Sequence, residues 1–240
     1  MNPKVLIISC IRNRAWILPK FLEAIDNIDY PNYECFFMEN DSDDNTFNLL
    51  KEYQGNLSVK KYLQRVKSDE KNIPDETRTQ YRKNGYSHLA DIRNILIEET
   101  LLWHSNFDYV LSIDSDIIVP KSIITDLLTY AGSKTIVAGA IANIPNKTVD
   151  GIAPCNFMTI QDGRMAHMRE YPTSGLIEVD LTGAVYMIPM KCLKDGVRYG
   201  ADPQGEDKVF CEIAKGKGYK LLVNLDCKPK HYMVKENFND

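Results

Sequence analysis

The first third of the chain alternates short apolar runs with segments of helical periodicity. Residues 5–8 form a continuous apolar run, which is typical of a buried parallel strand. Apolar side chains recur at helical spacing over residues 16–28, and residues 33–38 predict a second strand. A short helix near residues 47–53 and a strand over residues 57–63 follow. Repeated strand, helix and strand units predict an α/β fold with a mixed, mostly parallel sheet and helices on both faces.

A polar segment interrupts this pattern before it resumes. Residues 65–85 are charged and almost free of aliphatic side chains, which predicts an inserted loop or a lid. A long helix is predicted over residues 87–103 and an apolar strand from residue 109. The later pattern predicts a helix over 121–131, a strand over 134–142, a β-rich region over 157–189, a helix beginning at 205–207 and a final strand. Because no repeat or linker is visible, we expect one domain over residues 1–240.

Composition and charge exclude several classes of protein. The chain has 29 Lys and Arg against 33 Asp and Glu, so clustered excess basic charge for nucleic acid is missing. Its 44% of apolar residues can build a core, which argues against disorder. No run approaches the ~20 apolar residues of a transmembrane helix. The six cysteines are scattered singly, which favours free thiols in a reducing compartment, and we expect the cytoplasm.

The segment with the clearest chemistry is Asp114-Ser115-Asp116, at the end of the predicted strand that begins at residue 109. Ligands of open α/β sheets bind at the carboxyl ends of the strands. In extended chain, residues i and i+2 project to the same side, so both carboxylates could approach one Mg2+ or Mn2+ ion. The alternative is an acidic turn that precedes the next helix.

A second acidic group is Gly205-Glu206-Asp207. Acidic residues are favoured in the first turn of a helix by the macrodipole, which is the structural interpretation. The functional one is that a carboxylate accepts the proton of an attacking hydroxyl. His231 follows a predicted strand and is either structural or a nitrogen ligand of the same ion.

Together these segments resemble the GT-A glycosyltransferases, especially the family-2-like enzymes that use nucleotide-diphosphate sugars. The resemblance rests on six segments, which occur in the family's order: residues 39–46, Ala90 to Asn94, Asp114-Ser115-Asp116, Thr182-Gly183-Ala184, Gly205-Glu206-Asp207 and His231. The first departs from the family pattern because Glu39-Asn40 replaces its usual pair of Asp residues, although Asn can still hydrogen-bond a pyrimidine.

The resemblance implies a metal-dependent transferase that moves a sugar from a nucleotide-diphosphate sugar to an acceptor hydroxyl. Asp114, Asp116 and His231 are expected to hold Mn2+ or Mg2+. Asp207 is the expected base of an inverting reaction, with Glu206 orienting or binding the acceptor. The residues expected to bind the donor are Ser9, Glu39, Asn40, Arg93, Asp114, Ser115 and Gly183.

The resemblance also divides the expected domain into a nucleotide-binding half, residues 1–116, and an acceptor and catalytic half, residues 117–240. The acceptor class stays open among a glycan, a lipid-linked molecule and a protein. Two other functions remain open: a sugar nucleotidyltransferase, against which the glycine-free segment 9–14 counts, and a non-catalytic module that binds a nucleotide sugar or glycan.

Overall fold

The computed structural model describes residues 2–53, 55, 59–67, 84, 86–143, 155–168, 170–232 and 235. The elements that precede Asp114-Ser115-Asp116 are β1 (Val5–Ile11), α1 (Leu18–Asp26), β2 (Tyr33–Asn40), α2 (Thr46–Glu52), β3 (Lys61–Val66), α4 (Ser87–Trp103) and β4 (Tyr109–Ile113). The later ones are β5 (Ile117–Ile118), α5 (Ile123–Leu128), β6 (Thr135–Gly139), β7 (Ala142–Asn143), β8 (Phe157–Gln161), β9 (Arg164–His167), β10 (Leu176–Glu178), β11 (Leu181–Thr182), β12 (Val185–Pro189), α6 (Met190–Lys194), α7 (Glu206–Gly216), β13 (Lys220–Asn224) and β14 (Lys230–His231).

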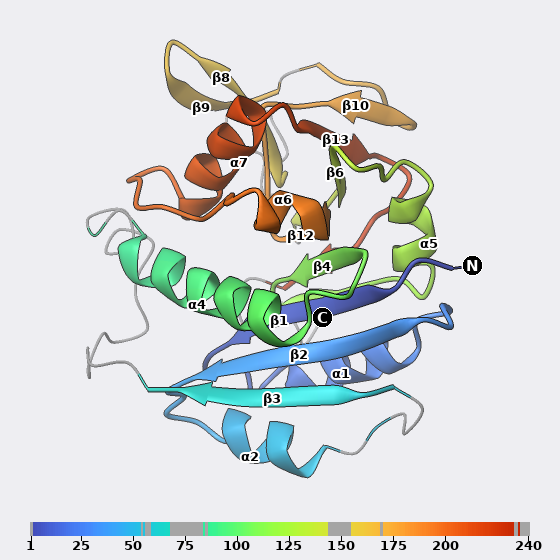
Figure 1. The fold of residues 1–240 in the computed structure, drawn as a ribbon, viewed down its shortest axis with the longest axis vertical. Helices are drawn as coiled ribbons and strands as arrows, with labels where there is room; N and C mark the ends of the chain where they lie inside the picture. The colour runs from blue at the N-terminus through green and yellow to red at the C-terminus, as the bar shows by residue number, and fades with distance from the viewer. Residues whose placement is uncertain are drawn as a thin grey trace.

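The central sheet of the described residues has eight strands in the order β10-β13-β6-β12-β4-β1-β2-β3 (Figure 1). Strand β1 lies in parallel between β2 and β4, while β12 runs antiparallel to both β4 and β6. The expected mixed, mostly parallel α/β sheet is therefore confirmed. Because the chain leaves β1 towards β2 on one side and reaches β4 on the other, the carboxyl end of β1 is a switch point, where such sheets bind ligands.

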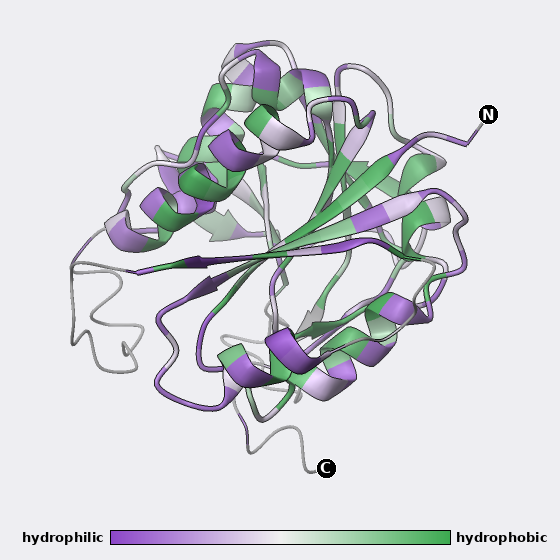
Figure 2. Ribbon diagram, turned by 60° about the horizontal axis from the view of Figure 1, so that its bottom comes forward, coloured by the Kyte–Doolittle hydropathy of each residue, from purple (hydrophilic) through white to green (hydrophobic). Residues whose placement is uncertain are grey.

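Two apolar layers sandwich the sheet. The side chains of α1, α2 and α5 pack with Ile7 on one face, and those of α4, α6 and α7 pack with Ile8 on the other. Adjacent strand residues point to opposite faces, so the continuous apolar run in β1 supplies both layers. In Figure 2 the strands are largely green, while the helices carry green and purple faces. This burial of both faces is why the strands lack polar alternation.

Several elements differ from the predictions. The strand expected over 57–63 is β3, displaced towards the C-terminus, and its end overlaps the predicted polar loop, of which residues 68–83 and 85 lie outside the described residues. The strand expected over 134–142 is divided into β6 and β7, because the chain leaves the sheet at Ala140, whose N–H donates to the carbonyl of Cys227 at 2.8 Å. Helix α6 was not predicted.

A small sheet near the carboxyl end of β4 has the strand order β5-β14-β7. Strand β14 pairs antiparallel with β5 and parallel with β7, which places His231 opposite Ile117. The six cysteines all lie in the described part of the chain and are free thiols. No helix in the described ranges is long and apolar enough to cross a membrane.

Candidate active site

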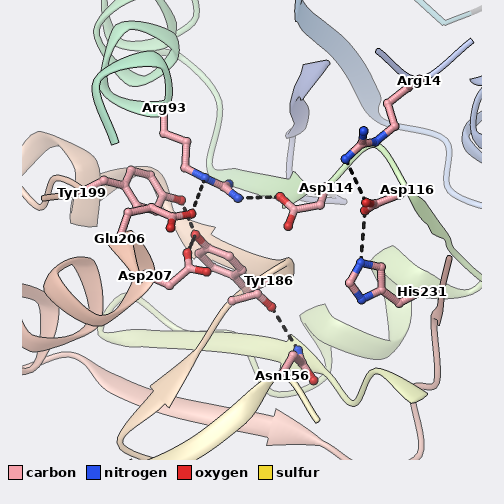
Figure 3. A network of polar contacts seen from close by, with 11 residues as sticks. Arg14, Arg93, Asp114, Asp116, Asn156, Tyr186, Tyr199, Glu206, Asp207 and His231 are labelled. Carbon is pink, nitrogen blue, oxygen red and sulfur yellow. Dashed lines mark hydrogen bonds and ion pairs between the residues drawn. The ribbon is translucent and has the colours of Figure 1, made fainter. Parts of the chain in front are cut away.

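The Asp114-Ser115-Asp116 segment forms a turn directly after β4. The N–H of Ile117 donates to the carbonyl of Asp114 at 3.1 Å, and the N–H of Asp114 donates to the carbonyl of Ala184 at 2.8 Å. The prediction that extended chain aims both carboxylates to one side is therefore wrong, because a turn separates their directions. Asp114 points towards Arg93 and Asp116 towards Arg14 and His231 (Figure 3).

Arg93 lies between the two acidic segments that the sequence analysis identified. From α4, its Nη2 is 2.7 Å from Asp114 Oδ1 and its Nε is 3.0 Å from Glu206 Oε1. The guanidinium also lies 5.2 Å from the ring centroid of Tyr199. Burial lowers the pKa of Arg93, but the charges of Asp114 and Glu206 outweigh it and raise this pKa, so the guanidinium stays charged. The residue therefore orients the two carboxylates.

Asp207 begins α7 beside Glu206. The hydroxyl of Tyr186 donates to Asp207 Oδ1 at 3.3 Å and also contacts the hydroxyl of Tyr199. Burial, followed by the charge of Glu206, raises the pKa of Asp207 well above its usual range. Glu206 itself is 4% exposed and paired with Arg93, which leaves Asp207 as the better placed proton acceptor of the two.

Gly183 makes room for the carboxylate of Asp207. It lies in the short connection between β11 and β12, and a Cβ at this position would overlap Asp207 Oδ2. The side chain of Asn156 fixes this connection, because its Nδ2 donates to the carbonyl of Gly183 at 3.0 Å. In this structure Gly183 thus leaves room for a side chain of the protein.

Asp116 is held between two basic groups. Its Oδ2 is 3.1 Å from Arg14 Nη2, and its Oδ1 is 3.3 Å from His231 Nε2. Burial raises the pKa of Asp116, but the hydrogen bond from His231 and the charge of Arg14 outweigh it and lower this pKa. Burial lowers the pKa of His231, and its hydrogen bond with Asp116 outweighs that effect and raises this pKa. The carboxylate is ionised and the imidazole is biased towards its charged form.

Two loops at the carboxyl ends of β1 and β2 hold each other in place. The N–H of Asn13 donates to Ser42 Oγ at 3.0 Å, and the N–H of Arg14 donates to Thr46 Oγ1 at 2.8 Å. The N–H of Ser42 donates in turn to Glu39 Oε1 at 2.7 Å. These bonds satisfy loop N–H groups that no strand can pair, which makes the edge of the site rigid.

Four of the residues expected to bind the donor are buried. Glu39 is fully buried and its Oε2 is 2.9 Å from Arg65 Nε, while Asn40 Oδ1 lies 3.3 Å from His88 Nε2. Ser9 is 2% exposed, and its hydroxyl has no hydrogen-bond partner among the described residues. Ser115 is 5% exposed. Glu39 and Asn40 lie at the carboxyl end of β2, and all four side chains are almost inaccessible to a ligand in this arrangement.

Sequence reasoning missed four residues of this network: Arg14, Asn156, Tyr186 and Tyr199. Arg14 had a usable signal, because it follows the first predicted strand and strand ends form the ligand edge. The other three had none, since tyrosines and a lone Asn in β-rich chain are common structural residues. Only the fold brings them to Asp207 and Gly183.

The side chains expected to hold a metal ion, Asp114, Asp116 and His231, lie at the turn after β4 and in the adjacent strand β14. Two carboxylates and an imidazole supply the oxygen and nitrogen ligands that Mn2+ accepts, and His231 and Asp116 are in contact. However, no three His, Cys, Asp or Glu side chains in the described part of the chain are already grouped as a metal cluster. In the present arrangement both oxygens of Asp116 contact basic side chains.

Comparisons with known proteins find similarity to glycosyltransferases. Residues 2–150 match a family model described as glycosyltransferase family 25, N-terminal domain. The chain is 26% identical over 197 residues to procollagen galactosyltransferase 2 of Homo sapiens, which covers 79% of this chain and 31% of that protein. The mouse protein of the same name is 25% identical over the same length. The chain therefore spans about a third of the length of these curated relatives.

Solved structures share the fold at low sequence identity. Mannosyltransferase PcManGT from Pyrobaculum calidifontis, in complex with GDP-Man and Mn2+, has a TM-score of 0.64 at 14% identity, covering 99% of this chain and 59% of that one. S. aureus TarS 1-349 in complex with UDP has a TM-score of 0.61 at 15% identity, covering 98% of this chain and 62% of that one. These likenesses confirm the expected GT-A fold.

Proposed function

The chain belongs to glycosyltransferase family 25, whose N-terminal domain matches residues 2–150, and we propose that it transfers a sugar from a nucleotide-diphosphate sugar to an acceptor hydroxyl. One observation carries the proposal. Arg93 joins the carboxylate after β4 to the one that begins α7, so that both predicted acidic segments form one site. The match to the family model and the shared fold confirm the resemblance to GT-A glycosyltransferases stated from the sequence. The UDP, UDP-GlcNAc and GDP-Man complexes of TarS and PcManGT support a nucleotide-sugar donor.

We propose that Asp114, Asp116 and His231 hold Mn2+ or Mg2+, as their donor chemistry allows. When bound, the ion would neutralise negative charge on the donor diphosphate. Support comes from the contact of His231 with Asp116 and from the Mn2+ in the PcManGT structure. Arg93 orients Asp114 and neutralises Glu206 through its two ion pairs, so it acts as a positioning residue.

Asp207 is the proposed base. It accepts the proton of the acceptor hydroxyl on Oδ1 or Oδ2, while the hydroxyl of Tyr186 orients the carboxylate by donating to Oδ1. Burial raises the pKa of Asp207, so its carboxylate binds a proton more strongly than an ordinary carboxylate does, as suits a base. Direct attack of the activated hydroxyl on the anomeric carbon would invert its configuration. Glu206 contributes by fixing Arg93 and not by touching the acceptor.

The two halves of the domain receive different tasks in this proposal. Residues 1–116 contribute the β1, β2 and β4 strand ends, where Glu39 and Asn40 would face the nucleoside. Residues 117–240 contribute Gly183, Asp207 and His231. Ser9 and Ser115 are as buried as Glu39 and Asn40, so all four would support the nucleoside from beneath this surface.

The first test separates transfer from the two other functions. Purified protein is incubated with a panel of nucleotide sugars and Mn2+, and the products are identified by mass spectrometry. We expect release of a nucleoside diphosphate, abolished by a chelator. Formation of a nucleoside triphosphate and a sugar 1-phosphate when pyrophosphate is added would indicate a nucleotidyltransferase, and saturable binding without any product would indicate a binding module. Either result contradicts the proposal.

The second test addresses the base. Asp207→Asn should keep Mn2+-dependent nucleotide binding and lose transfer by a factor of about 10² to 10⁴, the range typical of a general base. The matched control is Asp91→Asn, an exposed residue of α4 that faces away from this network. Full activity in Asp207→Asn would show that another group accepts the proton.

A further inference from the structure

Arg14 is the one member of the polar network whose charge has no part in the function proposed so far. Its backbone is fixed, because its N–H donates to Thr46 Oγ1 at 2.8 Å. Its Nη1 donates to the carbonyls of Arg12 and Asn13 at 3.2 and 3.3 Å, so the head of the side chain is aimed as well. Such a fixed guanidinium loses little conformational entropy on binding an anion.

The anion that it binds here is Asp116. Arg14 Nη2 lies 3.1 Å from Asp116 Oδ2, and His231 takes the other oxygen. The side chain of Asp116 is 10% exposed, whereas that of Arg14 is 30% exposed. The carboxylate is therefore committed to protein cations on both oxygens, and the arginine keeps an open side towards solvent.

This contact places a fixed positive charge where a divalent ion would need the same carboxylate. Two cations at one carboxylate repel each other, and the repulsion is strong where water is largely excluded. A guanidinium is also well suited to two phosphate oxygens, because its donors match their spacing. Arg14 can thus exchange one anion for another without leaving its loop.

We propose that Arg14 neutralises Asp116 in the free protein and binds the donor diphosphate when Asp116 binds the divalent ion. This inference rests on the proposed function. Arg14 opposes binding of the ion alone and favours binding of the ion together with a diphosphate. The exchange makes binding of the two ligands cooperative. The ion, by binding Asp116, frees Arg14 for the diphosphate, and the diphosphate, by binding Arg14, frees Asp116 for the ion.

The experiment measures ion and anion separately with probes that need no knowledge of the sugar. Binding of Mn2+ alone is followed by electron paramagnetic resonance, and binding of inorganic pyrophosphate in the presence of saturating Mn2+ by calorimetry. The wild type is compared with Arg14→Gln and Arg14→Lys. Arg198→Gln is the control, because that arginine forms an ion pair with Glu98 outside this network.

We expect opposite changes in Arg14→Gln. Its affinity for Mn2+ alone should rise about three- to tenfold, because the competing charge is gone, and its affinity for pyrophosphate should fall about tenfold or more. Arg14→Lys keeps the charge, so its Mn2+ affinity should stay within about twofold of the wild type. Arg198→Gln should change neither affinity.

Three results would overturn the inference. An Mn2+ affinity that falls or stays the same in Arg14→Gln would show that Arg14 does not compete with the ion. An unchanged pyrophosphate affinity would show that it does not bind the diphosphate. If the wild type binds neither probe, the metal-dependent function fails together with the inference, whereas normal wild-type binding with unaffected variants rejects the inference alone.

Discussion

At the scale of single residues, the site is a chain of charges and hydroxyls that satisfy one another without a ligand. Arg93 forms ion pairs with Asp114 and Glu206, and Arg14 forms one with Asp116. The hydroxyl of Tyr186 donates a hydrogen bond to Asp207. Buried charges of this kind are stable only when they are paired. A substitution of any of these residues should therefore leave its partner without a compensating contact and lower the stability of the protein.

Gly183→Ala should displace the carboxylate of Asp207, because the new methyl group would occupy the position of Oδ2. We expect a loss of stability of about 1–3 kcal/mol, typical of overpacking, and a fall in transfer of about a hundredfold. Gly216→Ala is the control, because a Cβ there meets no atom within 4 Å. Unfolding by urea and a transfer assay check both numbers, and equal behaviour of the two variants would exclude a steric role for Gly183.

The raised pKa of Asp207 gives stability a predictable pH dependence. In the folded protein Asp207 keeps its proton at pH values where the unfolded chain has lost it, so its contribution is greatest below the ordinary pKa of 3.8 and decreases as pH rises towards the raised value. Asp207→Asn removes this term. The free energy of unfolding of the variant minus that of the wild type should therefore increase with pH above about 4. A flat difference would mean that Asp207 titrates normally.

At the scale of elements, regular segments were predictable because their patterns are local. The helix expected over 87–103 is α4 with the same bounds, and the expected strands at 5–8 and 33–38 lie within β1 and β2. Two-residue strands such as β5 and β14 carry no periodicity of their own and exist only because distant segments pair. The turn after β4 was mistaken for extended chain for the same reason, since its geometry depends on Ala184.

The loops that follow β1 and β2 should behave as one unit. Thr46 is fully buried and its Oγ1 accepts the N–H of Arg14, so Thr46→Val leaves that N–H without its partner. We expect a loss of about 1–3 kcal/mol in the free energy of unfolding. Thr125→Val, an exposed change of the same shape on α5, should stay within about 0.5 kcal/mol. Chemical denaturation compares the two, and similar losses would refute the coupling of the loops.

At the scale of the whole molecule, the sequence identified most charged residues of the site but not their connections. Asp114, Asp116, Asp207 and His231 carry recognisable motifs, whereas their contacts depend on how β12, α4 and α7 meet over the sheet. A motif says that a carboxylate is present and leaves its partner undefined. Arg93 is the example: the sequence predicts a nucleotide contact for it, and the structure adds that it joins two acidic segments from opposite halves of the chain.

Removal of Arg93 should therefore weaken the whole domain and not only the site. Arg93→Ala leaves Glu206 and Asp114 without their counter-charge, and we expect a loss of about 3–5 kcal/mol. Adding Glu206→Gln should recover part of it, because one uncompensated charge disappears. Arg198→Ala, which breaks an ion pair with the exposed Glu98, should cost less than Arg93→Ala. Urea unfolding measures all three, and additive losses in the double variant would argue against the ion pair.

Strand β14 has a consequence for the order in which the molecule becomes competent. It fits between β5 and β7, and the N–H of Tyr232 donates to the carbonyl of Asp116 at 2.9 Å. During synthesis the ribosome releases Asp116 before His231, so β5 and β7 lack the strand that lies between them until β14 has been synthesised. The contacts of Asp116 with His231 and Tyr232 therefore form only after this later segment has joined the small sheet.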